Sequence, residues 1–410
     1  MSPEQRQTAS PAQPASPAQP ASPASLEWIS RLCRVDSTSR GSNQGVIDLV
    51  AEEFRRHGIE PHLFDSPDGL KKGLVATVPA ADGCTRGGVV ISGHTDVVPV
   101  DGQPWSSEPF EPEVREGLLY GRGTADMKGY LGIALHLLPR FVAAELAEPI
   151  HYALSYDEEV GCRGGDAIVE QINQLGLAPR AALVGEPTSM RIVRAHKSVC
   201  YVTVTFTGVE SHSSLTTHGV NAIHYGAELV AWWNQVAEGW KQHGPFDEAY
   251  PISHSTGGVN QFTGGTAGNI VPGRAQLVLE CRTVPGNDLD QLVAELHAFC
   301  DQLRSRMKAE NPAADVEVVV DAQAPALDTP ADAWVVELAE QLGGLPSEDK
   351  EAYATEAGQF GRGGIPAVVC GPGDIAQAHK ADEFLALDQI TACEAYLGRL
   401  VEVLGARTRT

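Results

Sequence analysis

Short apolar segments that alternate with helix-like stretches dominate the first half of the chain. Segments 73–79, 87–96, 150–159 and 181–188 are apolar, rich in strand-forming residues and bounded by turn residues. The stretches 44–57, 129–143 and 164–175 instead carry apolar residues at helical spacing. Strands separated by helices pair mainly in parallel and need helices on both faces of the sheet. The pattern therefore predicts an α/β, three-layer domain with a mostly parallel sheet.

The pattern changes after about residue 195, where a second arrangement begins. The segments 198–208, 257–265, 274–284 and 316–322 are strand-like, and the stretches 220–240 and 288–309 are helical. This order, βαββαβ, is that of a ferredoxin-like sandwich. Helix and strand alternate again at 331–342 and 365–372. We therefore expect one domain from residues 26–195 plus 325–410, with a smaller domain, residues 196–324, inserted into it.

A six-residue repeat of Ser, Pro, Ala and Gln fills residues 9–25. The repeat has no large apolar side chains to bury, and its prolines interrupt helices and sheets. It predicts a disordered tail over residues 1–25, with globular structure starting near Leu26. The N-terminus also lacks the basic and then apolar layout of a secretory signal.

The net charge of −23 argues against nucleic acid as a partner, because an acidic surface repels phosphate backbones. There is no run of about 18 apolar residues, the length that crosses a membrane. The eight cysteines are scattered without any CxxC pair, which is typical of free thiols in a reducing compartment. Together these features favour a cytoplasmic protein that acts on a small molecule, without nucleic-acid or membrane partners.

Side chains of types that can bind metal ions follow the ends of the predicted strands. These residues are His94, Asp96, Asp126, Glu158, Glu159, Glu186 and, in the last third of the chain, His379. In an open α/β sheet ligands bind at the carboxyl ends of the strands, so residues far apart in sequence can converge there. Taken singly, each has an ordinary alternative: a hydrogen-bonded histidine, a solvated glutamate pair, or Asp126 as a helix cap. The whole set at strand ends favours a shared site.

Two histidines and three carboxylates suit two zinc ions, each held by imidazole and carboxylate groups. A carboxylate such as that of Asp126 can bridge two ions, which together activate a water molecule for attack. A further carboxylate must then take the proton of that water and pass it to a leaving amine. The adjacent Glu158 and Glu159 offer this division between base and ligand.

Five motifs resemble one known family. They are GHTDVVP (93–99), YGRGTADMKG (120–129), DEEVG (157–161), GEPT (185–188) and AHKADEF (378–384). They are similar to motifs of the co-catalytic zinc metallopeptidase family that includes acetylornithine deacetylase, succinyl-diaminopimelate desuccinylase, carboxypeptidase G and aminoacylases. The resemblance extends over residues 26–405. It implies a zinc-peptidase-like catalytic domain, and an inserted domain that serves as lid and joins two copies into a homodimer.

The resemblance also implies a role for each matching residue. His94 and Glu186 would hold one zinc, Glu159 and His379 the other, and Asp126 would bridge them; cobalt could substitute. Glu158 would be the general base that later acts as general acid. Asp96 would orient the ring of His94 through its second nitrogen.

In the inserted domain, His212 matches a family residue that donates to the oxyanion, sometimes from the partner subunit. Asn269 and Arg282 resemble residues that contact the substrate. The planar guanidinium group of Arg282 would bind a substrate carboxylate through two parallel hydrogen bonds. An ordinary polar residue at position 212 and an exposed strand arginine at position 282 would look the same in sequence.

Residues 185–198 and 353–361 are most similar to acetylornithine deacetylases. This implies hydrolysis of N-acetyl-L-ornithine to L-ornithine and acetate, a step of arginine biosynthesis. Glu356 would then pair with the distal ammonium of the substrate, and Gly358 would leave room for backbone approach, or form only a turn. Ser198 and Arg163 depart from the usual motifs. Alternatives are a succinyl-diaminopimelate desuccinylase, an aminoacylase, a dipeptidase, or a metal-binding assembly module without activity.

Overall fold

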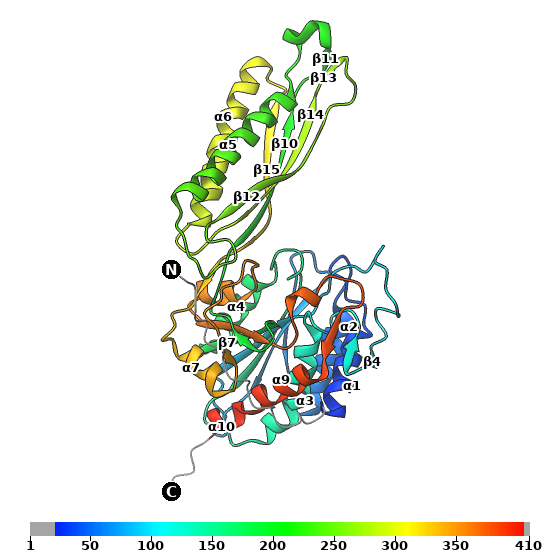
Figure 1. The fold of residues 1–410 in the computed structure, drawn as a ribbon, viewed down its shortest axis with the longest axis vertical. Coiled ribbons are helices and arrows are strands. Elements are labelled where there is room, and N and C mark those ends of the chain that lie inside the picture. The colour runs from blue at the N-terminus through cyan, green and yellow to red at the C-terminus, as the bar shows by residue number, and fades with distance from the viewer. Residues whose placement is uncertain (1–20, 406–410) are drawn as a thin grey trace, which may run out of the picture.

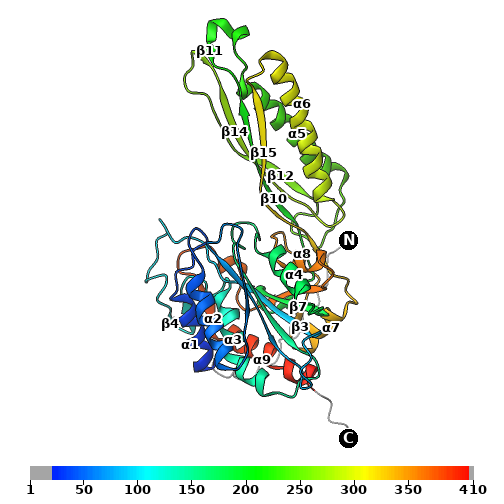
Figure 2. The same ribbon diagram turned by 180° about the vertical axis from the view of Figure 1, so that it is seen from behind.

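Two units with separate hydrophobic cores make up the structure, a computed structural model that describes residues 21–405 (Figure 1). The larger unit contains a six-stranded sheet between helices. The smaller unit contains a four-stranded sheet and two long helices, and one of its ends adjoins the larger unit (Figure 2).

The larger sheet is mixed, with a parallel majority. In spatial order its strands are β1 (His62–Asp65), β2 (Lys72–Val78), β6 (Ile150–Ser155), β3 (Val89–His94), β7 (Ala181–Pro187) and β18 (Ala367–Gly371). The last four run parallel, whereas β1 and β2 form an antiparallel edge. Every residue of these four parallel strands is buried, as expected when helices cover both faces. The predicted α/β class with a mostly parallel sheet is confirmed.

Helices pack on the two faces of this sheet because alternate strand residues point to opposite sides. Ile91 belongs to the core that contains residues of α1 (Pro23–Cys33), α2 (Gln44–Arg56), α3 (Lys128–Ala143), α7 (Trp334–Gln341), α9 (Leu387–Gly398) and α10 (Leu400–Leu404). Its neighbour Val90 belongs to the core beneath α4 (Gly165–Gln174) and α8 (Ala357–Arg362).

The smaller unit has the predicted βαββαβ order. Its elements are β10 (Val199–Thr207), α5 (Ala222–His243), β12 (Thr256–Gly264), β14 (Arg274–Arg282), α6 (Leu289–Glu310) and β15 (Asp315–Ala324). The sheet order is β12-β14-β10-β15, with every pair antiparallel. Both helices share one core with this sheet, which makes it a two-layer, ferredoxin-like sandwich. The chain enters at Val199 and leaves at Ala324, and these two residues are paired across β10 and β15.

Short elements complete the fold. Three strands, β4 (Glu113–Arg115), β5 (Leu118–Tyr120) and β19 (Phe384–Ala386), form a small antiparallel sheet. Two-stranded pairs join β8 (Arg191–Ile192) to β17 (Leu345–Pro346), β9 (Ala195–His196) to β16 (Leu327–Asp328), and β11 (Ser211–His212) to β13 (Ile270–Val271). The 3-10 turns are η1 (Ser213–His218) and η2 (Ile375–Gln377).

The predicted tail over residues 1–25 is wrong at its C-terminal end, because α1 begins at Pro23. The side chain of Ser22 accepts a hydrogen bond from the backbone N–H of Ala24, and proline is favourable at a first helical position. The same Ser-Pro pair that looks like repeat sequence therefore starts a helix. Residues 1–20, the rest of the predicted tail, lie outside the described residues.

None of the helices within residues 21–405 combines the length with the apolar character that crossing a lipid bilayer requires. The eight cysteines are all free thiols, as expected from their scattered positions. Seven are buried and only Cys84 is exposed.

Candidate metal centre

The candidate site lies where the parallel strands of the larger sheet end. His94 is the last residue of β3, and Glu186 is the penultimate residue of the neighbouring strand β7. On the other side of β3, Ser155 ends β6 in register with His94, so the loop that carries Glu158 and Glu159 starts beside it. The sheet geometry therefore brings these side chains together, as strand-end positions predict.

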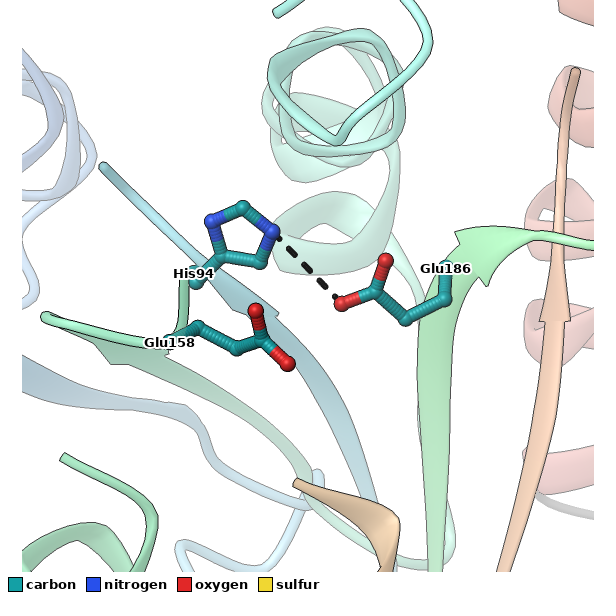
Figure 3. Close-up of side chains that lie close together, drawn as sticks. All are labelled: His94, Glu158 and Glu186. Atoms are coloured by element: carbon teal, nitrogen blue, oxygen red, sulfur yellow. Dashed lines mark ion pairs between the residues drawn. The ribbon is translucent and has the colours of Figure 1, made fainter. Parts of the chain in front are cut away.

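The imidazole of His94 is fully buried and faces two carboxylates. Its Nε2 lies 3.0 Å from Asp126 Oδ1. The same nitrogen lies 3.5 Å from Glu186 Oε1 (Figure 3). Its Nδ1 lies 2.9 Å from the backbone oxygen of Asp96, to which it can donate. That bond fixes the ring with Nε2 directed at the carboxylates.

The carboxylate of Asp96 lies at ion-pair distance from the ring that it is predicted to orient. It lies 3.6 Å from His94 Nδ1, too far for a hydrogen bond, and it is the backbone carbonyl that contacts the ring. The carboxylate instead accepts the backbone N–H groups of Glu158 and Glu159, at 3.2 and 3.4 Å, and the hydroxyl of Ser39 at 2.7 Å. Asp96 therefore also holds the loop that follows β6.

His379 completes the cluster from the far end of the sequence. It follows η2, has a positive φ of 61°, and places Nε2 2.8 Å from Glu159 Oε2 and 3.2 Å from Asp126 Oδ2. The two oxygens of Asp126 thus contact different imidazoles, which is the arrangement that a bridging carboxylate requires. The side chain of His379 is 53% exposed, so the cluster is open to solvent on this side.

Burial and mutual repulsion change the protonation of these groups. Burial raises the pKa of Glu158 to about 8 and that of Glu159 to about 7, and in both cases the nearby Asp126 carboxylate adds to the rise. Burial also raises the pKa of Glu186 well above its usual range. Hydrogen bonds to Asp126 and Glu159 raise the pKa of His379 to about 10. Several carboxylates in one buried space repel one another, and a positive charge placed between them would stabilise their ionised forms.

The residues fit divalent metal ions. Ligand atoms of His94, Glu158 and Glu186 lie within 4.8 Å of one another, as do those of His94, Asp126 and Glu159. The Oε1 atom of Glu159 is buried and has no hydrogen-bond partner among the described residues, as expected of an oxygen reserved for a cation. Imidazole and carboxylate groups are a donor set that suits zinc. All five predicted ligands therefore meet in one cluster.

Glu158 faces the same space as His94 and Glu186 (Figure 3). Its Oε1 accepts a weak hydrogen bond from the thiol of Cys162, with an Sγ–Oε1 distance of 3.2 Å. Glu158 is half-buried, and its carboxylate lies beside the other groups of the cluster. Its separate role as proton carrier stays a prediction.

Two charged residues beneath the cluster were missed in the sequence. Glu383 accepts the backbone N–H groups of Ala125 and Asp126 at Oε1, at 2.9 and 3.1 Å. Its Oε2 lies 2.6 Å from Nη1 of the buried Arg122. Both residues lie inside motifs that had been recognised, 120–129 and 378–384, which is the signal that could have identified them.

The predicted residues of the smaller unit lie elsewhere. His212 on β11, with Nδ1 2.7 Å from Ser214 Oγ, and Asn269 beside β13 lie at the end of this unit farthest from the larger sheet (Figure 1). Within one chain they are not brought to the metal centre. Arg282 lies at the junction of the units, where Nε is 2.7 Å from Glu280 Oε1 and Nη1 is 3.4 Å from the backbone oxygen of Ala352.

Glu356 is only 1% exposed and receives a 2.7 Å hydrogen bond at Oε2 from the hydroxyl of Ser155. Its Oε1 is buried without a partner among residues 21–405. The predicted substrate contact at Gly358 stays a prediction. A Cβ atom there would lie 2.0 Å from the backbone oxygen of Pro325, so the close approach that glycine permits is made by this chain itself.

Comparisons with known proteins agree with this geometry. Residues 90–403 match the peptidase family M20/M25/M40. The chain is 32% identical over 376 residues to an acetylornithine deacetylase of Myxococcus xanthus, covering 91% of this chain and 95% of that protein. It is 31% identical to an acetylornithine deacetylase of Proteus mirabilis over 90% and 92% of the two chains. The M20 family metallo-carboxypeptidase Sso-CP2 of Sulfolobus solfataricus has a similar fold, with a TM-score of 0.69, 20% identity, and coverage of 93% and 99%.

Proposed function

The chain belongs to peptidase family M20/M25/M40, and from this premise we propose that it hydrolyses N-acetyl-L-ornithine to L-ornithine and acetate. The reaction class follows from the family, whose members here are metal-dependent hydrolases. The substrate is suggested by the two acetylornithine deacetylases described above, which match nearly the whole chain. This activity would place the chain in arginine biosynthesis.

One observation carries the mechanism: His94 and His379 contact different oxygens of Asp126, with Glu158 beside them. We assign one zinc to His94 and Glu186, a second to Glu159 and His379, and the bridge to Asp126; cobalt has compatible ligand preferences. Bound there, the two metal ions would polarise the acyl carbonyl and lower the pKa of a water molecule.

The chain's own residues handle the proton. Glu158 accepts a proton from the attacking water as the new C–O bond forms, and returns it to the amine nitrogen as the C–N bond breaks. The pKa of its buried carboxyl group, raised by burial to about 8, suits a group that must both take and give a proton. Asp96 holds the loop that carries Glu158, through the backbone N–H groups described above.

The smaller unit would contribute through a second copy of the chain. His212 lies far from the metal centre of its own chain, so a role at the oxyanion requires the site of a partner in a homodimer. Mixing His212→Ala and Glu158→Gln chains tests this arrangement. Each variant alone should be nearly inactive, whereas mixed dimers should regain part of the activity, because one of their two sites has both groups. Absence of recovery in the mixture contradicts the dimeric site.

A substrate panel tests the reaction. Metal-free protein is reloaded with zinc or cobalt and assayed in parallel on N-acetyl-L-ornithine, N-succinyl-diaminopimelate, neutral N-acetyl amino acids and dipeptides. We expect the highest kcat/KM on N-acetyl-L-ornithine, and a loss of roughly 100- to 10,000-fold in kcat for Glu158→Gln, the usual contribution of general acid–base catalysis. Preference for another member of the panel overturns the substrate. Metal uptake without turnover of any member overturns the enzymatic proposal.

A further inference from the structure

The loop that follows Glu158 lies directly against the smaller unit. At Gly161, whose φ is +104°, an added Cβ would lie 2.2 Å from the Cβ of Ala322 in β15, so only glycine allows this approach. The next residue, Cys162, is 4% exposed and packs with Val199 and Ala324. These two residues are the paired ends of β10 and β15, where the chain passes between the units.

A β-bulge provides the third contact. Tyr201 pairs with Ala322 but Val202 pairs with Val320, so Asp321 is an extra residue in β15. A bulge leaves one residue outside the ladder and redirects its groups. The backbone oxygen of Asp321 accepts a hydrogen bond from Arg163 Nη2 at 2.8 Å. The irregularity in the strand thus presents an acceptor to the loop.

The same loop contacts the carboxylate of Glu158. The backbone N–H of Cys162 donates to the backbone oxygen of Glu158 at 2.7 Å, and the thiol donates to Oε1 at 3.2 Å. Gln359 of α8 donates to the backbone oxygen of Cys162 at 3.1 Å. One short segment is therefore bonded to Glu158 on one side and to the bulged strand of the smaller unit on the other.

We propose that Arg163 and Cys162 are positioning residues through which strand β15 of the smaller unit sets the position of the Glu158 carboxylate. The proposal rests on the proposed function in one respect, that Glu158 carries the proton. The bulge in β15 and the arginine at position 163, which departs from the usual motif, would then serve the same contact between the loop and β15. Neither positioning residue touches the five candidate metal ligands through its side chain. Substituting either residue should therefore change the alignment of the Glu158 carboxylate for the chemical step, and not metal binding.

Arg163→Ala tests the link, with Arg163→Lys as the conservative variant and Arg362→Ala as the matched control. Arg362 is also an exposed arginine, and it bonds Asp166 inside the larger unit at 2.6 Å. We expect Arg163→Ala to lower kcat by about tenfold, less than the roughly hundredfold cost of a 1 Å misplacement. KM and metal content should stay unchanged. Lysine, which can still donate to the Asp321 carbonyl, should restore part of kcat.

A second readout is independent of activity. Hydrogen–deuterium exchange of the metal-free chain should be faster in peptides covering residues 157–164 for Arg163→Ala, and unchanged there for Arg362→Ala. Unchanged exchange and kcat overturn the link. A rise in KM with unchanged kcat also overturns it, because Arg163 would then act on binding. If Glu158→Gln proves fully active, the proposed function fails, whereas the exchange result still decides whether β15 holds the loop.

Discussion

Arg122 and Glu383 form a fully buried ion pair directly behind Asp126, with Nη1 2.6 Å from Oε2. Glu383 is satisfied on both oxygens, because its Oε1 accepts two backbone N–H groups of the turn that presents Asp126. Removing one partner of a buried pair leaves the other charge without compensation. This pair therefore supports the turn that carries the central carboxylate of the site.

We predict that Glu383→Ala lowers the free energy of unfolding by about 3–5 kcal/mol, the usual cost of breaking a buried pair from one side. Denaturant unfolding of the metal-free chain measures this loss. The matched control is Glu111→Ala, which removes an exposed partner of Arg34 at 3.1 Å and should cost about 0–1 kcal/mol. Equal losses for the two variants would contradict the importance of burial.

Metal removal should destabilise the chain, because the buried carboxylates of Asp126, Glu159 and Glu186 then repel one another without a cation between them. A ligand that binds only the folded state at 100 times its Kd stabilises by about 2.7 kcal/mol. We therefore expect a clear fall in Tm on chelation and its recovery on adding zinc. Elemental analysis should give two ions per chain, and fewer for His379→Ala. An unchanged Tm after complete chelation contradicts the prediction.

The sequence was sufficient to predict which candidate metal-binding side chains cluster, because their positions depend on local geometry. Side chains at the ends of neighbouring parallel strands must meet, so His94 and Glu186 could be placed together without any tertiary information. The βαββαβ order of the smaller unit was equally accessible, since it follows from the periodicity of each segment. His379 was included in the same set of candidate side chains, although it follows the 3-10 turn η2 and not a strand, and the motif resemblance supplied its predicted role.

Features that depend on packing between distant segments could not be predicted. The distance of His212 from the metal centre depends on how the two units are arranged. The start of α1 was hidden because a helix cap and a Pro-rich repeat use the same residues. The neighbour of Gly358 is the backbone of Pro325, which no residue type reveals. Partners such as Arg122 and Glu383 are identified only when the fold shows which charges share a buried space.

Glu356 should select substrates that carry a distal positive charge. Its Oε1 has no partner within the described part of the chain, and burial raises the pKa of the carboxyl group to about 7. We predict that Glu356→Gln lowers kcat/KM on N-acetyl-L-ornithine by about tenfold or more, as expected for a lost charged hydrogen bond of roughly 1.5–3 kcal/mol. The value for a neutral N-acetyl amino acid should change little.

The neutral substrate is the control for this variant, because glutamine keeps an acceptor for the hydroxyl of Ser155. The wild-type ratio of kcat/KM between the cationic and the neutral substrate should also fall as the pH drops below 7, where Glu356 becomes protonated. Equal losses on both substrates, with a ratio independent of pH, would assign Glu356 a purely structural role.

His196 should make the fold sensitive to acid. The ring is fully buried at the junction of the units, where Nδ1 lies 2.9 Å from the backbone oxygen of Lys197 and Nε2 lies 3.1 Å from Thr355 Oγ1. Burial lowers its pKa from 6.5 to about 4. Between these values the unfolded chain binds a proton that the folded chain does not, so stability is lost as the pH falls from about 6.5 to 4.

The expected contribution is about 3–4 kcal/mol, because the pKa falls from 6.5 to about 4 and each pKa unit corresponds to about 1.4 kcal/mol. Urea unfolding of the metal-free chain at pH 7 and pH 4 measures it, with His196→Gln as the comparison because glutamine does not titrate. The wild-type chain should lose that much more free energy of unfolding than the variant over this interval, even though the variant starts from a lower stability. Parallel losses in both proteins would show that His196 is not held neutral by burial.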